Sequence, residues 1–148
     1  MAVAADPCPL CAEAGGILVY HAERWRIVRV EDADFPAFYR VIWNSHVAEF
    51  TDLSRAEQAE CMDAVAAVER VLREHLRPTK INLASLGNQV PHLHWHVIAR
   101  FGWDSRFPDP IWGVARRAVA EPAPAGRLAL PLDPLDLAVA SALAGARG

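Results

Sequence analysis

The sequence is poor in several residue types, and each scarcity narrows the class of protein. Cysteine occurs three times in 148 residues, too few for a disulfide framework. Lys80 is the single lysine, and a net charge of −3 gives no sign of the clustered basic face that nucleic-acid binding requires. We therefore expect no nucleic acid as a partner.

Long apolar runs are also absent. No run approaches the roughly 18 residues of a membrane-spanning helix, so we expect no membrane association. Residues 1–7 have neither the basic nor the long apolar region of a signal peptide. We therefore expect a cytoplasmic protein. The fractions of hydrophobic residues (53%) and charged residues (22%) are those of a single globular domain.

Three histidines alternate with apolar residues in one stretch, Pro91-His-Leu-His-Trp-His-Val-Ile-Ala-Arg100. A period of two is that of a β-strand, which predicts that His92, His94 and His96 share one face about 6.5–7 Å apart. Proline is tolerated at the first residue of a strand. Histidine is the side chain most readily recruited for acid-base, nucleophilic or metal chemistry near neutral pH. The row either binds one metal or divides the chemistry among its members.

Cys8-Pro9-Leu10-Cys11 is a Cys-x-x-Cys motif, which occurs in zinc knuckles, in redox pairs and by coincidence. A redox pair needs a preceding strand, and the chain before Cys8 is too short for a dependable one. A structural zinc needs two more ligands, usually Cys or His. Cys61 lies in a predicted helix among Ala and Val, where we expect a small buried hydrophobe.

Strands are predicted where β-branched and aromatic residues gather, at 17–20, 25–30, 38–43 and 80–87, followed by the triad strand. A helix is predicted over 51–77, where Ser54 and Glu57 form a capping box and Pro78 ends the helix. The Pro- and Trp-rich segment 107–113 predicts a loop. A short helix from Asp133 or Asp136 through Leu143 is possible in the Ala/Pro/Leu-rich C-terminal segment.

His92-Leu-His-Trp-His-Val-Ile98 resembles the signature of the histidine triad (HIT) superfamily of nucleotide hydrolases and transferases. The resemblance extends from about Cys8 to Trp112. It implies an α+β fold with an antiparallel sheet of about five strands, one long helix and a short N-terminal helix or knuckle. We place the HIT domain at 1–115 and treat 116–148 as an extension of it, not a separate domain.

The resemblance also implies a division of labour among the histidines. In zinc-binding members a Cys-x-x-Cys, one later histidine and the first triad histidine hold the metal. A closed set of two thiolates and two imidazoles would make that zinc structural, and the matching residues here are Cys8, Cys11, His46 and His92. His94 would then attack the α-phosphorus of a nucleotide, and His96 would stabilise the phosphoryl oxygens.

Substrate-binding residues follow from the same resemblance, with departures. Asn82 and Gly87 match the family by spacing, while Asn88 stands where Gln is usual and Gln89 where Ser or Thr is usual. Asn82, Asn88 and Gln89 would contact phosphate oxygens or the leaving group. Glu31 or Asp32 would accept the ribose hydroxyls.

Within the superfamily, the predicted function is a hydrolase or nucleotidyl transferase acting on nucleoside phosphoramidates or dinucleoside polyphosphates. Leu93 argues against the uridylyltransferase branch, which has proline there, and the lack of any cysteine after Cys61 argues against the aprataxin branch. The resemblance implies a homodimer and no organic cofactor. Two other classes stay open: a nucleotide-binding or scaffolding protein with little turnover, and a metalloenzyme that uses the triad histidines as ligands.

Overall fold

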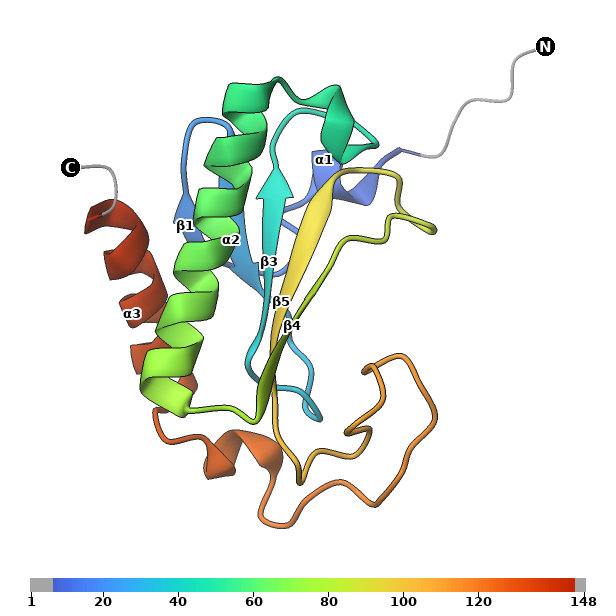
Figure 1. Ribbon diagram of the computed structural model, residues 1–148, viewed down its shortest axis with the longest axis vertical. Helices are drawn as coiled ribbons and strands as arrows, with labels where there is room; N and C mark the ends of the chain where they lie inside the picture. Colours follow the sequence, from blue (N-terminus) through green and yellow to red (C-terminus); the bar gives the residue numbers. More distant parts are fainter. Residues whose placement is uncertain (1–6, 146–148) are drawn as a thin grey trace.

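Five strands form one antiparallel sheet in the computed structural model, which describes residues 7–145 (Figure 1). The spatial order is β1-β2-β3-β5-β4. The strands are β1 (Ile17–His21), β2 (Trp25–Arg29), β3 (Phe38–Trp43), β4 (Lys80–Ala84) and β5 (His94–Arg100). This arrangement confirms the predicted α+β fold with a five-stranded antiparallel sheet.

The long predicted helix is present with a break near its start. A 3₁₀ helix, η1 (Phe50–Asp52), precedes α2 (Arg55–Leu76). The Ser54 side chain accepts from the Glu57 N–H at 3.2 Å, and the Glu57 carboxylate accepts from the Ser54 N–H at 2.8 Å, as the capping box predicts. The helix ends where Arg77 adopts a φ of 47° before Pro78.

Two helices cover one face of the sheet. α2 and α3 (Leu132–Gly145) pack against each other and against the strands (Figure 1). The main core lies beneath them and contains side chains that alternate along the strands, such as Ile27, Val41 and Val97. Asp136 joins α3 to the sheet, because its carboxylate accepts from Tyr39 Oη at 2.6 Å and from Arg29 Nε at 3.0 Å. Burial, followed by the hydrogen bond to Asp136 and its charge, raises the pKa of Tyr39.

The other face of the sheet carries two smaller apolar clusters with polar residues between them. One cluster joins Leu10, from the short helix α1 (Pro9–Ala12), to Val28 and Ile42. The second lies toward the opposite end of the strands and consists of Phe35, Phe38, Ile98 and Ile111. Between them β3 and β5 are paired at Arg40 and His96, and at Ile42 and His94. This central region is the candidate site.

The triad stretch is only partly a strand. β5 begins at His94, and the His92 N–H donates to the Val90 carbonyl at 2.8 Å in a tight turn just before it. The prediction of three histidines in one strand row is therefore wrong for His92, whereas Leu93 and Val97 enter the main core as predicted. The fourth strand also ends earlier than predicted, at Ala84.

The long connection from β5 back to the helical face contains a second short 3₁₀ helix, η2 (Pro124–Arg127). Within residues 7–145, no helix combines the length and the apolar character needed to cross a membrane.

Candidate active site and metal centre

His94 is held at one ring nitrogen. Its Nδ1 lies 2.6 Å from the backbone carbonyl oxygen of His92. A carbonyl only accepts hydrogen bonds, so Nδ1 carries the proton and Nε2 keeps its lone pair. Burial, opposed by this hydrogen bond, and the nearby charge of Arg40 hold the pKa of His94 below its usual range. A neutral imidazole with a free nitrogen is a competent nucleophile.

His96 lies beside His94 at right angles to it. The two ring centroids are 5.0 Å apart, closer than the strand spacing of about 6.5–7 Å, because one ring edge turns toward the other's face. Burial, followed by the effects of His94 and Arg40, lowers the pKa of His96 to about 3. Its Nδ1 is buried without a partner among the described residues. His96 is therefore a neutral imidazole with hydrogen-bonding capacity to spare.

Both histidines open into a cavity of about 540 Å³. Part of its lining comes from the N-terminal segment and part from the turn that enters the triad. Asn88 and Gln89, the predicted substrate-binding residues of that turn, are among the lining residues. Trp112 also lines the cavity, and its ring centroid lies 5.2 Å from that of His96. The full lining is Pro9, Leu10, Glu13, Gly15, Arg40, Leu86, Gly87, Asn88, Gln89, Val90, His94, His96 and Trp112.

A second cluster brings together the four residues predicted to bind zinc. Cys8, Cys11, His46 and His92 each place one ligand atom within 4.8 Å of the others. Cys8 Sγ lies 3.4 Å from His92 Nδ1. Cys11 Sγ lies 3.4 Å from His46 Nδ1 and 3.5 Å from His92 Nδ1. The Nδ1 atoms of the two histidines are 3.2 Å apart. These four residues lie close enough to bind a metal ion.

The donor spacing fits a tetrahedral ion. Zn–S bonds of about 2.3 Å and Zn–N bonds of about 2.0–2.1 Å imply, at tetrahedral angles, separations of roughly 3.3–3.4 Å between two nitrogens and roughly 3.5–3.6 Å between sulfur and nitrogen. His92 is fixed for this purpose, because its Nε2 donates to the Trp43 carbonyl at 2.6 Å and Nδ1 is left as a ligand atom. Neither His94 nor His96 belongs to a metal-ligand cluster within residues 7–145.

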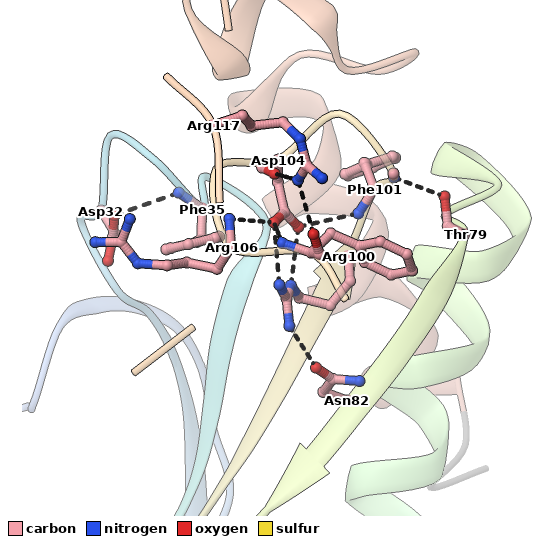
Figure 2. A network of polar contacts seen from close by, with 11 residues as sticks. Asp32, Phe35, Thr79, Asn82, Arg100, Phe101, Asp104, Arg106 and Arg117 are labelled. Carbon is pink, nitrogen blue, oxygen red and sulfur yellow. Dashed lines mark hydrogen bonds and ion pairs between the residues drawn. The ribbon is translucent and has the colours of Figure 1, made fainter. Parts of the chain in front are cut away.

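Asn82 lies near the triad but is already hydrogen-bonded. It is paired with Ile98 on β5, and its Oδ1 accepts from Arg100 Nη1 at 2.8 Å (Figure 2). Arg100 is itself buried in an ion pair with Asp104 at 2.9 Å. The structure does not place Asn82 among the cavity-lining residues.

The Asp104 carboxylate organises the loop after β5. It also accepts from the backbone N–H groups of Phe101, Arg106 and Phe107 (Figure 2). Burial alone would raise the pKa of Asp104, but the hydrogen bonds and the charge of Arg100 bring it below its usual range. This network anchors the start of the loop that carries Trp112 to the cavity.

Glu31 and Asp32, predicted to bind ribose, are not among the cavity-lining residues. Asp32 Oδ1 accepts from the Asp34 and Phe35 N–H groups at 2.9 and 3.3 Å (Figure 2). This is a local turn contact, which Asp commonly makes.

Sequence reasoning overlooked Arg40 and Ser85. Arg40 lines the cavity, and its one sequence signal is a charge in the middle of an aromatic and β-branched strand. Ser85 donates to the His94 carbonyl at 2.9 Å and fixes the backbone of that residue. A lone serine after a strand gives no signal of such a contact.

The architecture and the histidine arrangement match one known class of domain. The family described as "HIT domain" matches residues 12–102. The chain belongs to the HIT family.

Solved structures agree with this membership. A histidine triad protein from Bradyrhizobium japonicum is 31% identical, with a TM-score of 0.64 over 73% of this chain and 81% of that one. A histidine triad protein from Marinobacter aquaeolei has a TM-score of 0.64 over 90% and 89% of the two chains at 23% identity, and supports the fold alone.

A curated relative is similar over a shorter region. The protein named AP-4-A phosphorylase in Mycobacterium tuberculosis is 33% identical over 84 residues, which are 53% of this chain and 43% of the relative. The chain thus spans less than half of the length of that relative.

Proposed function

We propose that the protein is a nucleotide hydrolase or nucleotidyl transferase that acts at the α-phosphate through a covalent nucleotidyl-His94 intermediate. The observation that carries this proposal is the 2.6 Å contact between His94 Nδ1 and the His92 carbonyl. It fixes the tautomer whose free Nε2 lies at a cavity large enough for a nucleotide moiety. HIT membership and the similarity to AP-4-A phosphorylase support a nucleotide substrate.

The proposed reaction has two displacement steps. In the first, His94 Nε2 forms a bond to the α-phosphorus while the bond to the leaving group breaks, and the leaving group departs with the electron pair, taking a proton from solvent when it is the amine of a phosphoramidate. Nδ1 keeps its proton throughout. In the second, a water or another acceptor attacks phosphorus, the P–N bond breaks, and the electron pair returns to Nε2. One proton of the attacking water passes to solvent.

His96 has a supporting role in this scheme. A neutral imidazole still has one N–H to donate, and in this buried position it would hydrogen-bond to a non-bridging phosphoryl oxygen as charge develops there. Asn88 and Gln89 also line the cavity and would supply further polar groups for the phosphate or the leaving group. Asn82 would have to break its hydrogen bond to Arg100 in order to contact the substrate. Glu31 and Asp32 would contact only a substrate that extends beyond the cavity.

We also propose that Cys8, Cys11, His46 and His92 hold a structural zinc. The ion would join the N-terminal segment to the turn before β5. Its contribution is positional: fixing His92 fixes the carbonyl that holds the His94 proton. No open coordination position would remain for chemistry.

The substrate class is tested with a panel of nucleoside phosphoramidates and dinucleoside polyphosphates read by mass spectrometry. We expect release of a nucleoside monophosphate, and a fall of at least about 10³-fold in kcat/KM for His94→Ala, since the nucleophile is lost. His75→Ala on the exposed surface of α2 is the matched control and should turn over normally. Tight nucleotide binding without turnover of any panel member would favour a binding protein instead.

A further inference from the structure

The cavity holds a charge that the scheme above does not use. Arg40 projects from the middle of β3, directly opposite His96 in the sheet register. Among the described residues that line the cavity, it is the one with a permanent positive charge. A bound phosphate therefore has no other permanent positive charge in this lining to compensate its own.

The guanidinium lacks an acidic partner inside the described part of the chain. The ion pairs of residues 7–145 join Arg24 to Glu60, Arg29 to Asp136, Arg100 to Asp104 and Arg116 to Asp109, each with N···O within 4.0 Å. Arg40 is in none of them. It is half-buried, and desolvating a cation without a counter-charge is costly. An anionic ligand would offset that cost.

Two contacts fix where the guanidinium lies. Nη1 donates to the Gly15 carbonyl at 3.1 Å, and the group lies 5.8 Å from the centre of the Phe38 ring. Gly15 sits above Ile42, because a Cβ on Gly15 would come within 2.9 Å of the Ile42 side chain. Ile42 is opposite His94 in the register. The guanidinium therefore lies between Phe38, which is paired with Ile98, and Gly15, which lies against the residue opposite His94.

Hydrogen-bonding capacity remains on this group. Nε is buried and has no partner in the described residues, and Nη1 alone makes a hydrogen bond to another described residue. A guanidinium with free N–H groups beside a cavity is well suited to phosphate oxygens, since its fork matches their spacing.

We propose that Arg40 is a further catalytic residue, whose guanidinium binds the non-bridging oxygens of the phosphate that faces His94. This assignment rests on the proposed function. Arg40 compensates the negative charge of the phosphate in a cavity that Asn88 and Gln89 also line. As negative charge grows on those oxygens during attack, the interaction strengthens, and this accelerates the reaction.

The test compares the binding of AMP and adenosine by calorimetry, so that no turnover is needed. Arg40→Met should weaken AMP binding at least about tenfold, since a charge-assisted contact is lost, and leave adenosine binding within about twofold. Arg40→Lys should restore part of the AMP affinity. Arg24→Met, which removes an exposed arginine and changes the net charge equally, is the matched control and should bind both ligands normally. On a turned-over substrate, Arg40→Met should lower kcat by about 10²–10³-fold.

Equal weakening of AMP and adenosine would show that Arg40 only tethers Gly15, and would overturn the proposal. So would AMP binding within twofold of the native value in Arg40→Met. The two proposals fail separately. A native protein that forms no His94 adduct but discriminates AMP through Arg40 refutes the covalent mechanism alone. An adduct with AMP binding indifferent to Arg40 refutes the present assignment alone.

Discussion

At the scale of single residues, hydrogen bonds to backbone carbonyls fix the orientation and the tautomer of two histidine rings. His94 and His92 each donate one ring N–H to a carbonyl, of His92 and Trp43, at 2.6 Å. Each contact selects one tautomer and leaves the other ring nitrogen without the proton, for the proposed nucleophilic attack in His94 and the proposed metal ligation in His92. Sequence spacing cannot specify such contacts, because they depend on where a distant backbone oxygen lies.

The buried ion pair between Arg100 and Asp104 makes the free energy of unfolding depend on pH. The pKa of Asp104 is lower in the folded protein than in the unfolded chain. The unfolded chain therefore binds more protons near pH 4, and the stabilising contribution is fully present above that pH. It is lost as pH falls through the lower, folded pKa.

Asp104→Asn should lower the free energy of unfolding by about 3 kcal/mol at neutral pH, because a buried guanidinium loses its counter-charge. Urea titrations from pH 2 to pH 7 measure this. The gap between native protein and variant should be constant above about pH 5 and shrink below about pH 4. The protonation of histidines in the unfolded state affects both proteins and cancels in the comparison.

Asp109→Asn is the matched control, since Asp109 pairs with Arg116 on the same loop but is solvent-exposed. Asp109→Asn should lower the free energy of unfolding by less than Asp104→Asn does. A gap between native protein and Asp104→Asn that does not change with pH would contradict the assignment.

At the scale of elements, the sequence predicts the identity of strands and helices well, and their ends well in some elements and poorly in others. β3 is observed at 38–43 and α2 at 55–76, close to the predicted 38–43 and 51–77. The signals were the aromatic and β-branched residues of β3, and the capping box and terminal proline of α2. The triad strand starts late because His92 joins a turn, an interaction with Val90 that alternation alone does not encode.

Sequence motifs and the family resemblance predicted part of the candidate site. Cys8, Cys11, His46 and His92 were grouped by family resemblance, and the structure brings them together. Arg40 was not found, because its role depends on pairing with His96 across strands that are far apart in sequence. Trp112 reaches the cavity through a loop whose course is set by Asp104, which no local pattern reveals.

Removal of the metal tests the link between the N-terminal segment and β5. The protein should contain about one zinc per chain, and Cys8→Ser should lose it and unfold at a lower temperature, because metal binding contributes to folding stability. Turnover should fall but persist in Cys8→Ser, since the variant keeps His94. Plasma mass spectrometry and calorimetry measure metal content and melting.

Cys61→Ala is the matched control for the metal experiment, because Cys61 is a buried residue of α2 and lies outside the cluster. It should retain zinc. A native protein without metal after expression in zinc-supplemented medium, or a Cys8→Ser variant with full zinc content, would contradict the zinc proposal.

At the scale of the whole molecule, we propose that two copies pair along the outer strand β4. A strand at the edge of a sheet has unpaired backbone groups, and β4 is the last strand in the sheet order. Leu83 on this strand is 45% exposed, and Leu86 just beyond it is 54% exposed. Apolar side chains beside an open edge are suited to a protein contact.

Light scattering should give a native mass twice the chain mass of 16.2 kDa. Leu83→Lys should reduce it to one chain, because a charge would be buried in the interface. Leu137→Lys makes the same change on α3, where the side chain is 72% exposed, and should leave the mass unchanged. A monomeric native protein, or a dimer unaffected by Leu83→Lys, would contradict this interface.

The most direct measurement is peptide mapping by mass spectrometry after a rapid acid-free quench of a single turnover with a nucleotide substrate. The account predicts one nucleotidyl group on the peptide containing His94, formed before product release and missing in His94→Ala. Product formation without any labelled peptide, or with the label on a different residue, would contradict the account.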